Sequence, residues 1–230
     1  MKIENIMQQG TFIKRLNRFE ALVDINGEVE LVHVPNTGRC KELFIEGVTV
    51  LLEQRNGPHR KTKYELAMVY KGERLISIDS QLPNKLAAEA AGSGRIPEIS
   101  GYDFIKRESV YGNSRFDLYL ERPDSKCFVE VKGVTLENDE IAMFPDAPTE
   151  RGTKHIYELM AARKEGYRAI LLFVIQMKNV RYFTPNTKTD PDFASALAAA
   201  EKAGVEIYAY DCHVRESEII FGQAIPVILP

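Results

Sequence analysis

Up to Pro83, the chain alternates short β-prone runs with turn-forming residues. The β-prone runs cover residues 11–14, 18–25, 29–33 and 48–54. Asn26 and Gly27 form the pair typical of a tight β-hairpin, and a further turn is expected at 56–58. Short strands separated by turns predict a small barrel or sandwich, and a five-stranded barrel of the oligonucleotide-binding (OB) type fits this length. We therefore expect residues 1–82 to form an OB-fold-like β-barrel domain.

Beyond Pro83, strands alternate with helices. Asn84 is expected to cap a short helix over 85–91. Strands are expected at 104–111, 115–121, 126–132, 168–176 and 205–211, with a hairpin or strand at 134–143. Helices are expected from Thr149 or Glu150 to Glu165 and from Asp190 to Ala203. This alternation predicts an α/β domain with a central mixed sheet over residues 83–230.

Composition places the chain among ordinary globular proteins. Hydrophobic residues make up 44% of the 230 positions and charged residues 27%, and no apolar run approaches the roughly 20 residues that a membrane span needs. Segment 1–10 lacks the apolar stretch of a secretory signal. The widely spaced cysteines Cys40, Cys127 and Cys212 favour reduced thiols over disulfides or a zinc site. We therefore expect a cytoplasmic protein.

The segment 114–132 contains the candidate chemistry. It is predicted to form a hairpin whose tip is Pro123-Asp124, and in this register Asp117 lies opposite Glu130. Lys132 shares the face of Glu130, while Phe116 and Leu118 share the other face of their strand. Two opposed carboxylates repel each other, and a divalent cation relieves that repulsion. With Lys132 beside an attacking water or a phosphate, the set suits metal-assisted phosphodiester hydrolysis.

An acid two residues before a lysine is by itself a common pattern. It also occurs in this chain at Asp124 and Lys126, within a turn. The competing interpretation is a partly exposed sheet face on which Asp117, Glu130 and Lys132 form surface ion pairs. The buried character of 127–131 and the acid across the hairpin favour a site.

The predicted helix after Pro148 adds candidate phosphate ligands. Arg151, Lys154 and His155 lie within about one turn of its N-terminus, where the helix dipole favours anions. Alternatively, Lys154 pairs with Glu158 four residues later and His155 covers the surface.

Four stretches are characteristic of one family, in the same order: 33–39 (HVPNTGR), 111–117 (YGNSRFD), 128–133 (FVEVKG) and 144–155 (FPDAPTERGTKH). On these stretches the chain resembles the sugar fermentation stimulation protein A family along almost its whole length. The resemblance implies an N-terminal OB barrel, a C-terminal domain of the PD-(D/E)XK nuclease-like fold, DNA binding and a role in sugar utilisation. The nuclease pattern maps onto Asp117, Glu130 and Lys132.

The set of two acids and a lysine on one predicted sheet face indicates a Mg²⁺ or Mn²⁺ ion held by Asp117 and Glu130, with the Val131 carbonyl as a further ligand. The nuclease fold often adds an acid on its first helix, where this chain has Glu89. Glu98 and Glu108 are the alternatives for this role, and a solvated helix face is the competing interpretation of Glu89.

Phosphate contacts are also expected from basic residues outside the helix. The loop residue Arg39, the cluster Lys14, Arg15 and Arg18, and Arg115 beside the acid pair are the candidates. The net charge of −3 counts mildly against nucleic-acid binding, but local basic patches bind phosphate on slightly acidic proteins.

Three functions compete. The first is a Mg²⁺- or Mn²⁺-dependent nuclease acting on DNA, and the second is a non-enzymatic DNA-binding regulator of sugar (maltose-type) metabolism on a nuclease-like scaffold. The third, a small-molecule or protein-interaction module, leaves the carboxylate pair unexplained. The sequence leaves open whether the nucleic acid is single- or double-stranded and whether it is DNA or RNA. A homodimer could present two sites to two strands.

Overall fold

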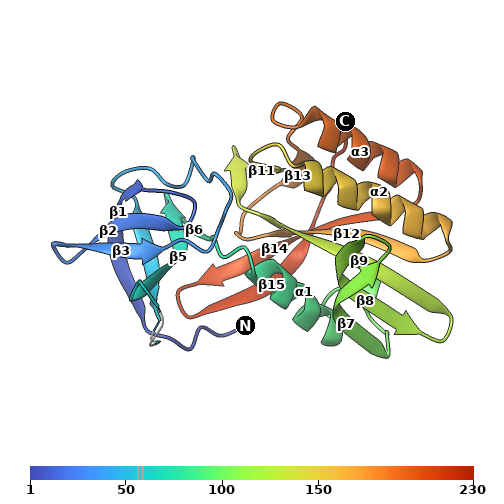
Figure 1. The fold of residues 1–230 in the computed structure, drawn as a ribbon, viewed down its shortest axis with the longest axis horizontal. Coiled ribbons are helices and arrows are strands. Elements are labelled where there is room, and N and C mark those ends of the chain that lie inside the picture. Colours follow the sequence, from blue (N-terminus) through green and yellow to red (C-terminus); the bar gives the residue numbers. More distant parts are fainter. Residues whose placement is uncertain (56, 58–59) are drawn as a thin grey trace.

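The computed structural model describes residues 1–55, 57 and 60–230, which form two domains side by side (Figure 1). The turn expected at 56–58 falls partly outside the described residues. No helix in the described part of the chain is long and apolar enough to cross a membrane.

The N-terminal domain is a closed barrel. Its strands are β1 (Met7–Arg15), β2 (Glu20–Ile25), β3 (Glu28–His33), β4 (Thr49–Gln54), β5 (Tyr64–Lys71) and β6 (Arg74–Ser77). They follow the order β3-β2-β1-β4-β5-β6, and pairing of β3 with β5 closes the sheet. The predicted hairpin turn is confirmed, because Asn26 and Gly27 both have the positive φ that this tight turn requires.

The C-terminal domain is built on a six-stranded mixed sheet of order β15-β14-β12-β9-β8-β7. Its strands are β7 (Phe104–Tyr111), β8 (Ser114–Arg122), β9 (Ser125–Val134), β12 (Arg168–Ile175), β14 (Glu206–Arg215) and β15 (Glu218–Ile225). A smaller sheet contains β10 (Leu136–Asn138), β11 (Ile141–Phe144) and β13 (Tyr182–Pro185). Parallel pairing joins β9 to β12 and β12 to β14, so the predicted fold class is confirmed.

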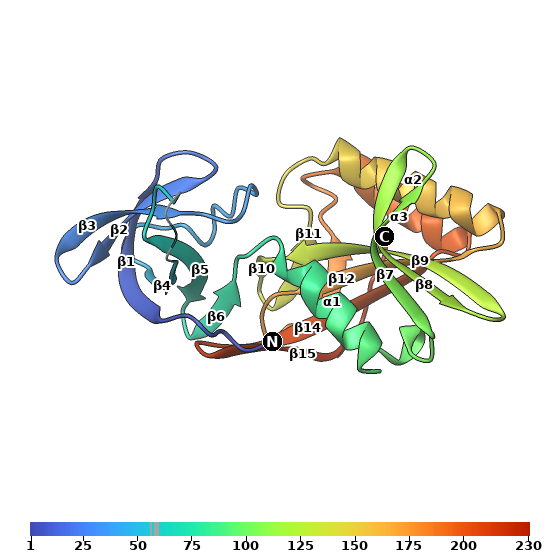
Figure 2. The same cartoon turned by 60° about the horizontal axis from the view of Figure 1, so that its bottom comes forward.

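Helices cover both faces of the large sheet (Figure 2). They are α1 (Leu82–Gly92), α2 (Glu150–Lys164) and α3 (Pro191–Lys202), and a 3₁₀ turn covers Pro97–Ile99. On β12 the side chains alternate between the faces, so that Leu171 and Phe173 pack with α2 and α3 while Ile170 and Leu172 pack with α1. The helix starts follow capping rules, since the Thr149 and Asp190 side chains accept hydrogen bonds from Gly152 and Phe193 N–H.

The two domains share polar contacts as well as core packing. Glu137 is only 6% exposed, and its carboxylate forms ion pairs with Lys71 and Arg74 of the barrel and accepts a hydrogen bond from Lys71. The carboxylate of Asp146 accepts from the backbone N–H groups of Arg39 and Cys40 at 2.7 and 3.2 Å. These contacts fix the loop 36–40 of the barrel against the α/β domain.

Candidate functional site

Asp117 and Glu130 lie on the neighbouring strands β8 and β9. Leu118 pairs with Val129, and Arg122 pairs with Ser125 at the hairpin tip, as the predicted register requires. Backbone pairing between the two strands extends from the hairpin tip to Leu118. Beyond it the Asp117 carboxylate takes over, since its Oδ2 accepts the Val131 N–H at 2.7 Å. The carboxylate therefore replaces a backbone acceptor at the end of this ladder.

The strand is distorted at Asp117. Phe116 packs on the α2 side against Phe128, with ring centroids 5.2 Å apart, whereas Leu118 packs on the α1 side. The prediction that Phe116 and Leu118 share a face is therefore wrong. The physical reason is that the pairing of β8 with both of its neighbours, β7 and β9, is interrupted beside Asp117. The opposing residue on β7, Glu108, has a left-handed φ of 53° and is not paired with Asp117.

Glu130 is buried, with 3% of its surface exposed. Its Oε1 accepts a hydrogen bond from Lys132 Nζ at 2.6 Å and also bonds Nδ1 of His155 on α2. Burial by itself would raise the pKa of this carboxyl, but the hydrogen bonds and charges of His155 and Lys132 outweigh it and hold the pKa below its usual value. Glu130 is therefore ionised, and its Oε2 has no hydrogen-bond partner among the described residues.

Asp117 has the opposite behaviour. Burial and then the nearby charge of Glu130 raise its pKa to about 6, against the lowering effects of Val131 N–H, Lys132 and Asn84. The ionised pair is thus electrostatically unfavourable without a further positive charge. Such a pair is typical of sites that hold a cation or move a proton.

A divalent metal fits these residues. The unpartnered Glu130 Oε2 is a buried acceptor, and Asp117 and Glu130 together supply the one or two carboxylates with which Mg²⁺ sites are usually built. No group of three or more His, Cys, Asp or Glu side chains suited to a metal occurs in the described part of the chain. The remaining ligands would therefore be backbone carbonyl, water and substrate oxygens.

The structure does not bring the candidate third acids to this pair. Glu89 is exposed on α1, and its carboxylate lies 3.8 Å from the N-terminal ammonium of Met1. Glu98 accepts a hydrogen bond from Tyr210 at 2.6 Å. The backbone of Glu108 lies opposite Asp117, but its carboxylate is exposed and lies 3.4 Å from Arg115.

Asn84 is the α1 residue that reaches the site. Its Nδ2 donates to Asp117 Oδ1 at 2.6 Å. The prediction that Asn84 caps the helix is wrong, because α1 begins earlier, at Leu82, after the N-cap residue Gln81. Proline in the first turn favours that start. The sequence signal that could have identified Asn84 was its place on the first helix, where an acid was sought.

Three residues predicted to contact phosphate are engaged elsewhere. His155 is 5% exposed and bonds Glu130, because its position on α2 faces the sheet. The Arg15 guanidinium donates to the carbonyls of Asn36, Gly38, Arg39 and Arg18, so it shapes the barrel loop. Lys154 lies 3.6 Å from Glu158, as in the alternative interpretation of this helix.

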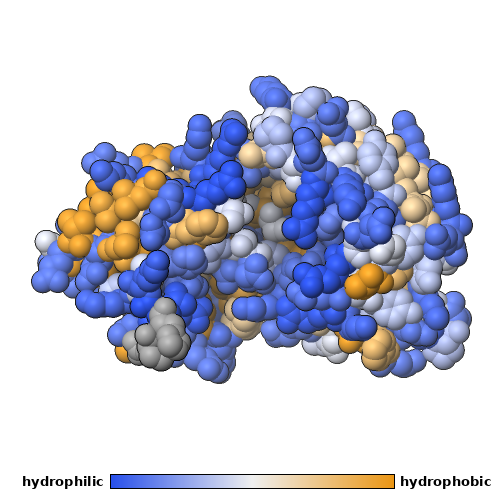
Figure 3. All heavy atoms as spheres, viewed as in Figure 1, coloured by the Kyte–Doolittle hydropathy of each residue, from blue (hydrophilic) through white to orange (hydrophobic). Residues whose placement is uncertain are grey.

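The other predicted basic residues stay exposed. Arg18 and Arg39 join Lys41, which the sequence analysis did not single out, around a groove of about 780 Å³ between the barrel and the loop before α2. None of the described residues that line this groove is acidic. Arg151 is exposed at the start of α2, and Lys14 is exposed on β1. Figure 3 shows hydrophilic side chains around the hollow between the two domains.

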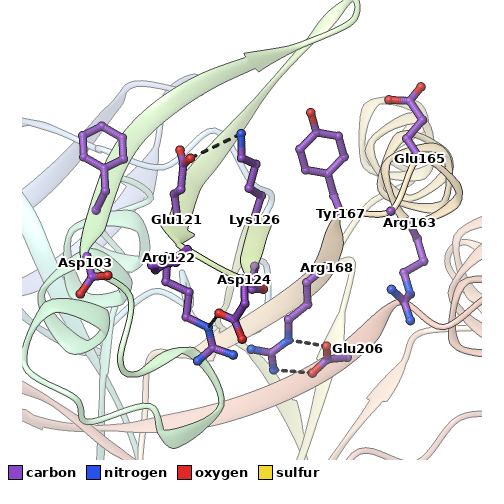
Figure 4. Close-up of a pocket in the computed structure, with 14 residues that line it drawn as sticks. Asp103, Glu121, Arg122, Asp124, Lys126, Arg163, Glu165, Tyr167, Arg168 and Glu206 are labelled. Atoms are coloured by element: carbon purple, nitrogen blue, oxygen red, sulfur yellow. Dashed lines mark hydrogen bonds and ion pairs between the residues drawn. The ribbon is translucent and has the colours of Figure 1, made fainter.

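A second concavity, of about 880 Å³, lies at the β8–β9 hairpin tip (Figure 4), at the opposite end of these strands from Asp117. Three of its four basic side chains are paired, Arg122 with Asp124, Lys126 with Glu121 and Arg168 with Glu206. The fourth, Arg163, lines it together with the acids Asp103 and Glu165. The paired charges leave little net field for an anion, so this concavity is a poor candidate for phosphate binding.

Comparisons with known proteins agree with these observations. Residues 13–78 match the model of the SfsA N-terminal OB domain, and residues 81–218 match the sugar fermentation stimulation protein RE domain. Sugar fermentation stimulation protein homologs from Thermoanaerobacter sp. (strain X514) and Clostridium botulinum (strain Langeland) are 54% and 52% identical, over 100% and 99% of both chains. The structure of Pyrococcus furiosus SfsA in complex with Ca²⁺ matches with a TM-score of 0.90 at 35% identity, covering 100% of each chain. The chain therefore belongs to the sugar fermentation stimulation protein family, as its motifs indicated.

Proposed function

We propose that this protein is a divalent-metal-dependent nuclease that acts on DNA. The observation that carries the proposal is the buried Glu130, whose Oε2 is unpartnered, beside an Asp117 carboxyl of raised pKa and with Lys132 at 2.6 Å. A non-catalytic surface would have no need to place a buried acid beside a second acid that repels it. The related Pyrococcus furiosus SfsA was solved in complex with Ca²⁺, which supports a divalent ion as the cofactor.

Asp117, Glu130 and the Val131 carbonyl would hold Mg²⁺ or Mn²⁺. Such a metal lowers the pKa of a bound water and neutralises charge on a phosphate. His155 and Lys132 keep Glu130 ionised and fix its orientation, because both bond the same oxygen and leave Oε2 free. Asn84 holds Asp117 in place. Lys132 Nζ lies 2.6 Å from Glu130 Oε1 and would orient the attacking water or the phosphate.

The experiment is a cleavage assay with single-stranded, double-stranded and branched DNA, in Mg²⁺, Mn²⁺ or EDTA. We expect the wild-type protein to cleave DNA with Mg²⁺ or Mn²⁺ but not in EDTA. Asp117→Ala and Lys132→Ala should both abolish this cleavage. Lys202→Ala, an exposed change at the end of α3, serves as the control and should cleave normally. Metal-dependent cleavage that persists in Asp117→Ala would contradict the proposal.

The basic groove would guide the DNA backbone toward the acids. Replacing Arg39 and Lys41 by Ala should weaken DNA binding several-fold and lower the salt dependence of log K by about one for each contact removed. Fluorescence anisotropy over a salt series measures both quantities, with Lys202→Ala again as control. An unchanged salt slope would show that DNA does not follow this groove.

A binding-only function is the second candidate. It is favoured by Asp117, whose two oxygens are already engaged by Asn84 and Val131. In that case DNA would bind in EDTA and be released by salt, and no metal would produce cleavage. A regulatory role in sugar metabolism would then rest on binding alone.

A further inference from the structure

The side chain of Arg15 is held rigidly in the wall of the basic groove. A guanidinium has five N–H donors, and in Arg15 all five donate to backbone carbonyls, at 2.5 to 3.0 Å. These carbonyls belong to Asn17, Arg18, Asn36, Gly38 and Arg39. The edge of the guanidinium therefore has no donor left for a phosphate, although the group keeps its positive charge.

The two flat faces of this guanidinium have different surroundings. One face lies over the ring of Phe44, with Cζ 5.0 Å from the ring centroid. Phe44 in turn stacks on the buried Phe12, with 5.3 Å between the ring centroids. Because the edge is fully bonded and one face is covered, a ligand in the groove meets Arg15 through the face turned away from Phe44. Guanidinium planes are among the groups on which unpaired nucleobases stack.

The groove also carries cations that are suited to phosphate. Arg18, Arg39 and Lys41 line it and are exposed, and none of the described lining residues is acidic. Leu16, which is 48% exposed, adds an apolar side chain to the same lining. The volume of about 780 Å³ lies within the roughly 300–1,000 Å³ of pockets that hold drug-sized molecules, so a nucleotide unit fits.

A flat cationic face beside free cations discriminates between the two forms of DNA. In a duplex each base is stacked between its neighbours, so its flat face is not available to a side chain. In a single strand the face of a base is free, and proteins that bind single strands combine a positively charged groove with surfaces on which bases stack. The Arg15 face is therefore suited to a single strand.

We propose that the basic groove binds single-stranded DNA, with one base stacked on the free face of the Arg15 guanidinium. Arg18, Arg39 and Lys41 bond the adjoining phosphates. Every base has a π-face, so this stacking does not depend on sequence. The inference rests on the proposed function for the groove as a DNA site, and it assigns the single strand as the substrate class.

The test compares oligothymidylate with an abasic chain of the same length, which has the same phosphates and no bases. Fluorescence anisotropy in EDTA should show the wild type binding oligothymidylate at least about fivefold more tightly, because stacking of one base contributes that factor or more. Oligothymidylate should also bind more tightly than a duplex with the same total number of phosphates. Equal affinity for oligothymidylate and the abasic chain, or tighter binding of the duplex, would overturn the proposal.

Variants then locate the stacking surface. Arg15→Lys keeps the charge but removes the planar face, so it should remove the advantage of oligothymidylate over the abasic chain. Arg18→Ala removes a phosphate contact and should weaken both by the same factor. The matched control is Arg122→Lys, since the Arg122 guanidinium also lies 5.0 Å over an aromatic ring, that of Tyr102, but outside the groove. It should leave both affinities unchanged.

A purely structural role of Arg15 gives a different result. If Arg15 only shapes the loop 36–40, Arg15→Lys should weaken both chains equally, and this outcome would overturn the proposal. If Arg15→Lys fails to fold in a thermal melt, photocrosslinking of the wild type to oligothymidylate that carries 4-thiothymidine decides. Crosslinks within 15–18 or 37–44 are expected, and crosslinks confined to other segments would overturn the proposal.

These results are separable from those of the nuclease proposal. An advantage of oligothymidylate over the abasic chain in EDTA, without cleavage in any metal, would support stacking on Arg15 and overturn the nuclease. Metal-dependent cleavage together with equal affinity for the two chains would overturn the stacking and leave the nuclease standing.

Discussion

Asp117→Asn is expected to abolish metal-dependent DNA cleavage and, at the same time, to stabilise the metal-free protein. The loss of activity follows from removing one of the two carboxylates that would hold the metal. A metal contributes several kcal/mol to such a reaction, so the rate should fall about a thousandfold. Steady-state cleavage rates at saturating Mn²⁺ measure it.

The gain in stability follows from the raised pKa of Asp117. In the folded protein its pKa is about 6, above its ordinary value of 3.8. The folded state therefore binds more protons than the unfolded state between these values, and Asp117 lowers the free energy of unfolding as the pH rises from about 4 to about 6. At pH 8 a neutral Asn avoids this loss, which amounts to about 1–3 kcal/mol. The melting temperature should rise by a few degrees to about ten degrees.

The hydrogen bonds at Asp117 survive the change, because the Asn84 amide can turn. Val131 N–H would donate to the new carbonyl oxygen, and the new amide would donate to Asn84. Asp124→Asn, at the exposed hairpin tip, is the control and should move neither quantity. Mn²⁺ should raise the melting temperature of the wild type but not of Asp117→Asn. A lower melting temperature in EDTA for Asp117→Asn would contradict the electrostatic argument.

Glu137→Ala is expected to cause the second large effect, a loss of about 3–5 kcal/mol in the free energy of unfolding. Glu137 is 6% exposed and bonds Lys71 at 2.7 Å, Arg74 at 2.8 Å and the Glu140 N–H at 2.6 Å. Removing one partner of a buried ion pair leaves the other charges poorly compensated. Urea unfolding followed by circular dichroism measures the loss.

Its pH dependence provides an independent check. Although burial by itself would raise the pKa of Glu137, the Lys71 and Arg74 interactions hold it at about 2, below the ordinary 4.5. Its contribution to stability is therefore present above pH 4.5 and is lost as the pH falls toward 2. The matched control is Glu140→Ala, whose carboxylate is 55% exposed beside Arg181; exposed pairs contribute about 0–1 kcal/mol. Equal losses in the two variants would show that the Glu137 cluster does not stabilise the protein.

Local patterns were sufficient to predict most elements and the register of the β8–β9 hairpin between its tip and Leu118. The turn residues Asn26 and Gly27 and the caps Thr149 and Asp190 act over a few positions, so their geometry can be read from the chain. The register from Leu118 to Arg122 follows from a two-residue turn.

Contacts between distant segments decided the rest. Asn84 bonds Asp117 across 33 positions, and Arg15 bonds Gly38 across 23. The local pattern was equally consistent with a capping role for Asn84 and a phosphate-binding role for Arg15. His155 lies on a helix start suited to anions, but the face it presents to β9 was fixed only by packing of α2 on the sheet. The distortion at Asp117 likewise depends on a left-handed Glu108 in the neighbouring strand.

The buried cluster that includes Phe12 and Val23 of the barrel also includes Phe173 and Phe183 of the α/β domain. A chain cut between the two would expose this shared interior on both fragments. For that reason the barrel is a poor module for transfer to other proteins, and the two halves are expected to have been inherited together. Gene fusions or domain exchanges at this junction should be rare among relatives, in contrast to proteins whose nucleic-acid-binding barrels are joined by open linkers.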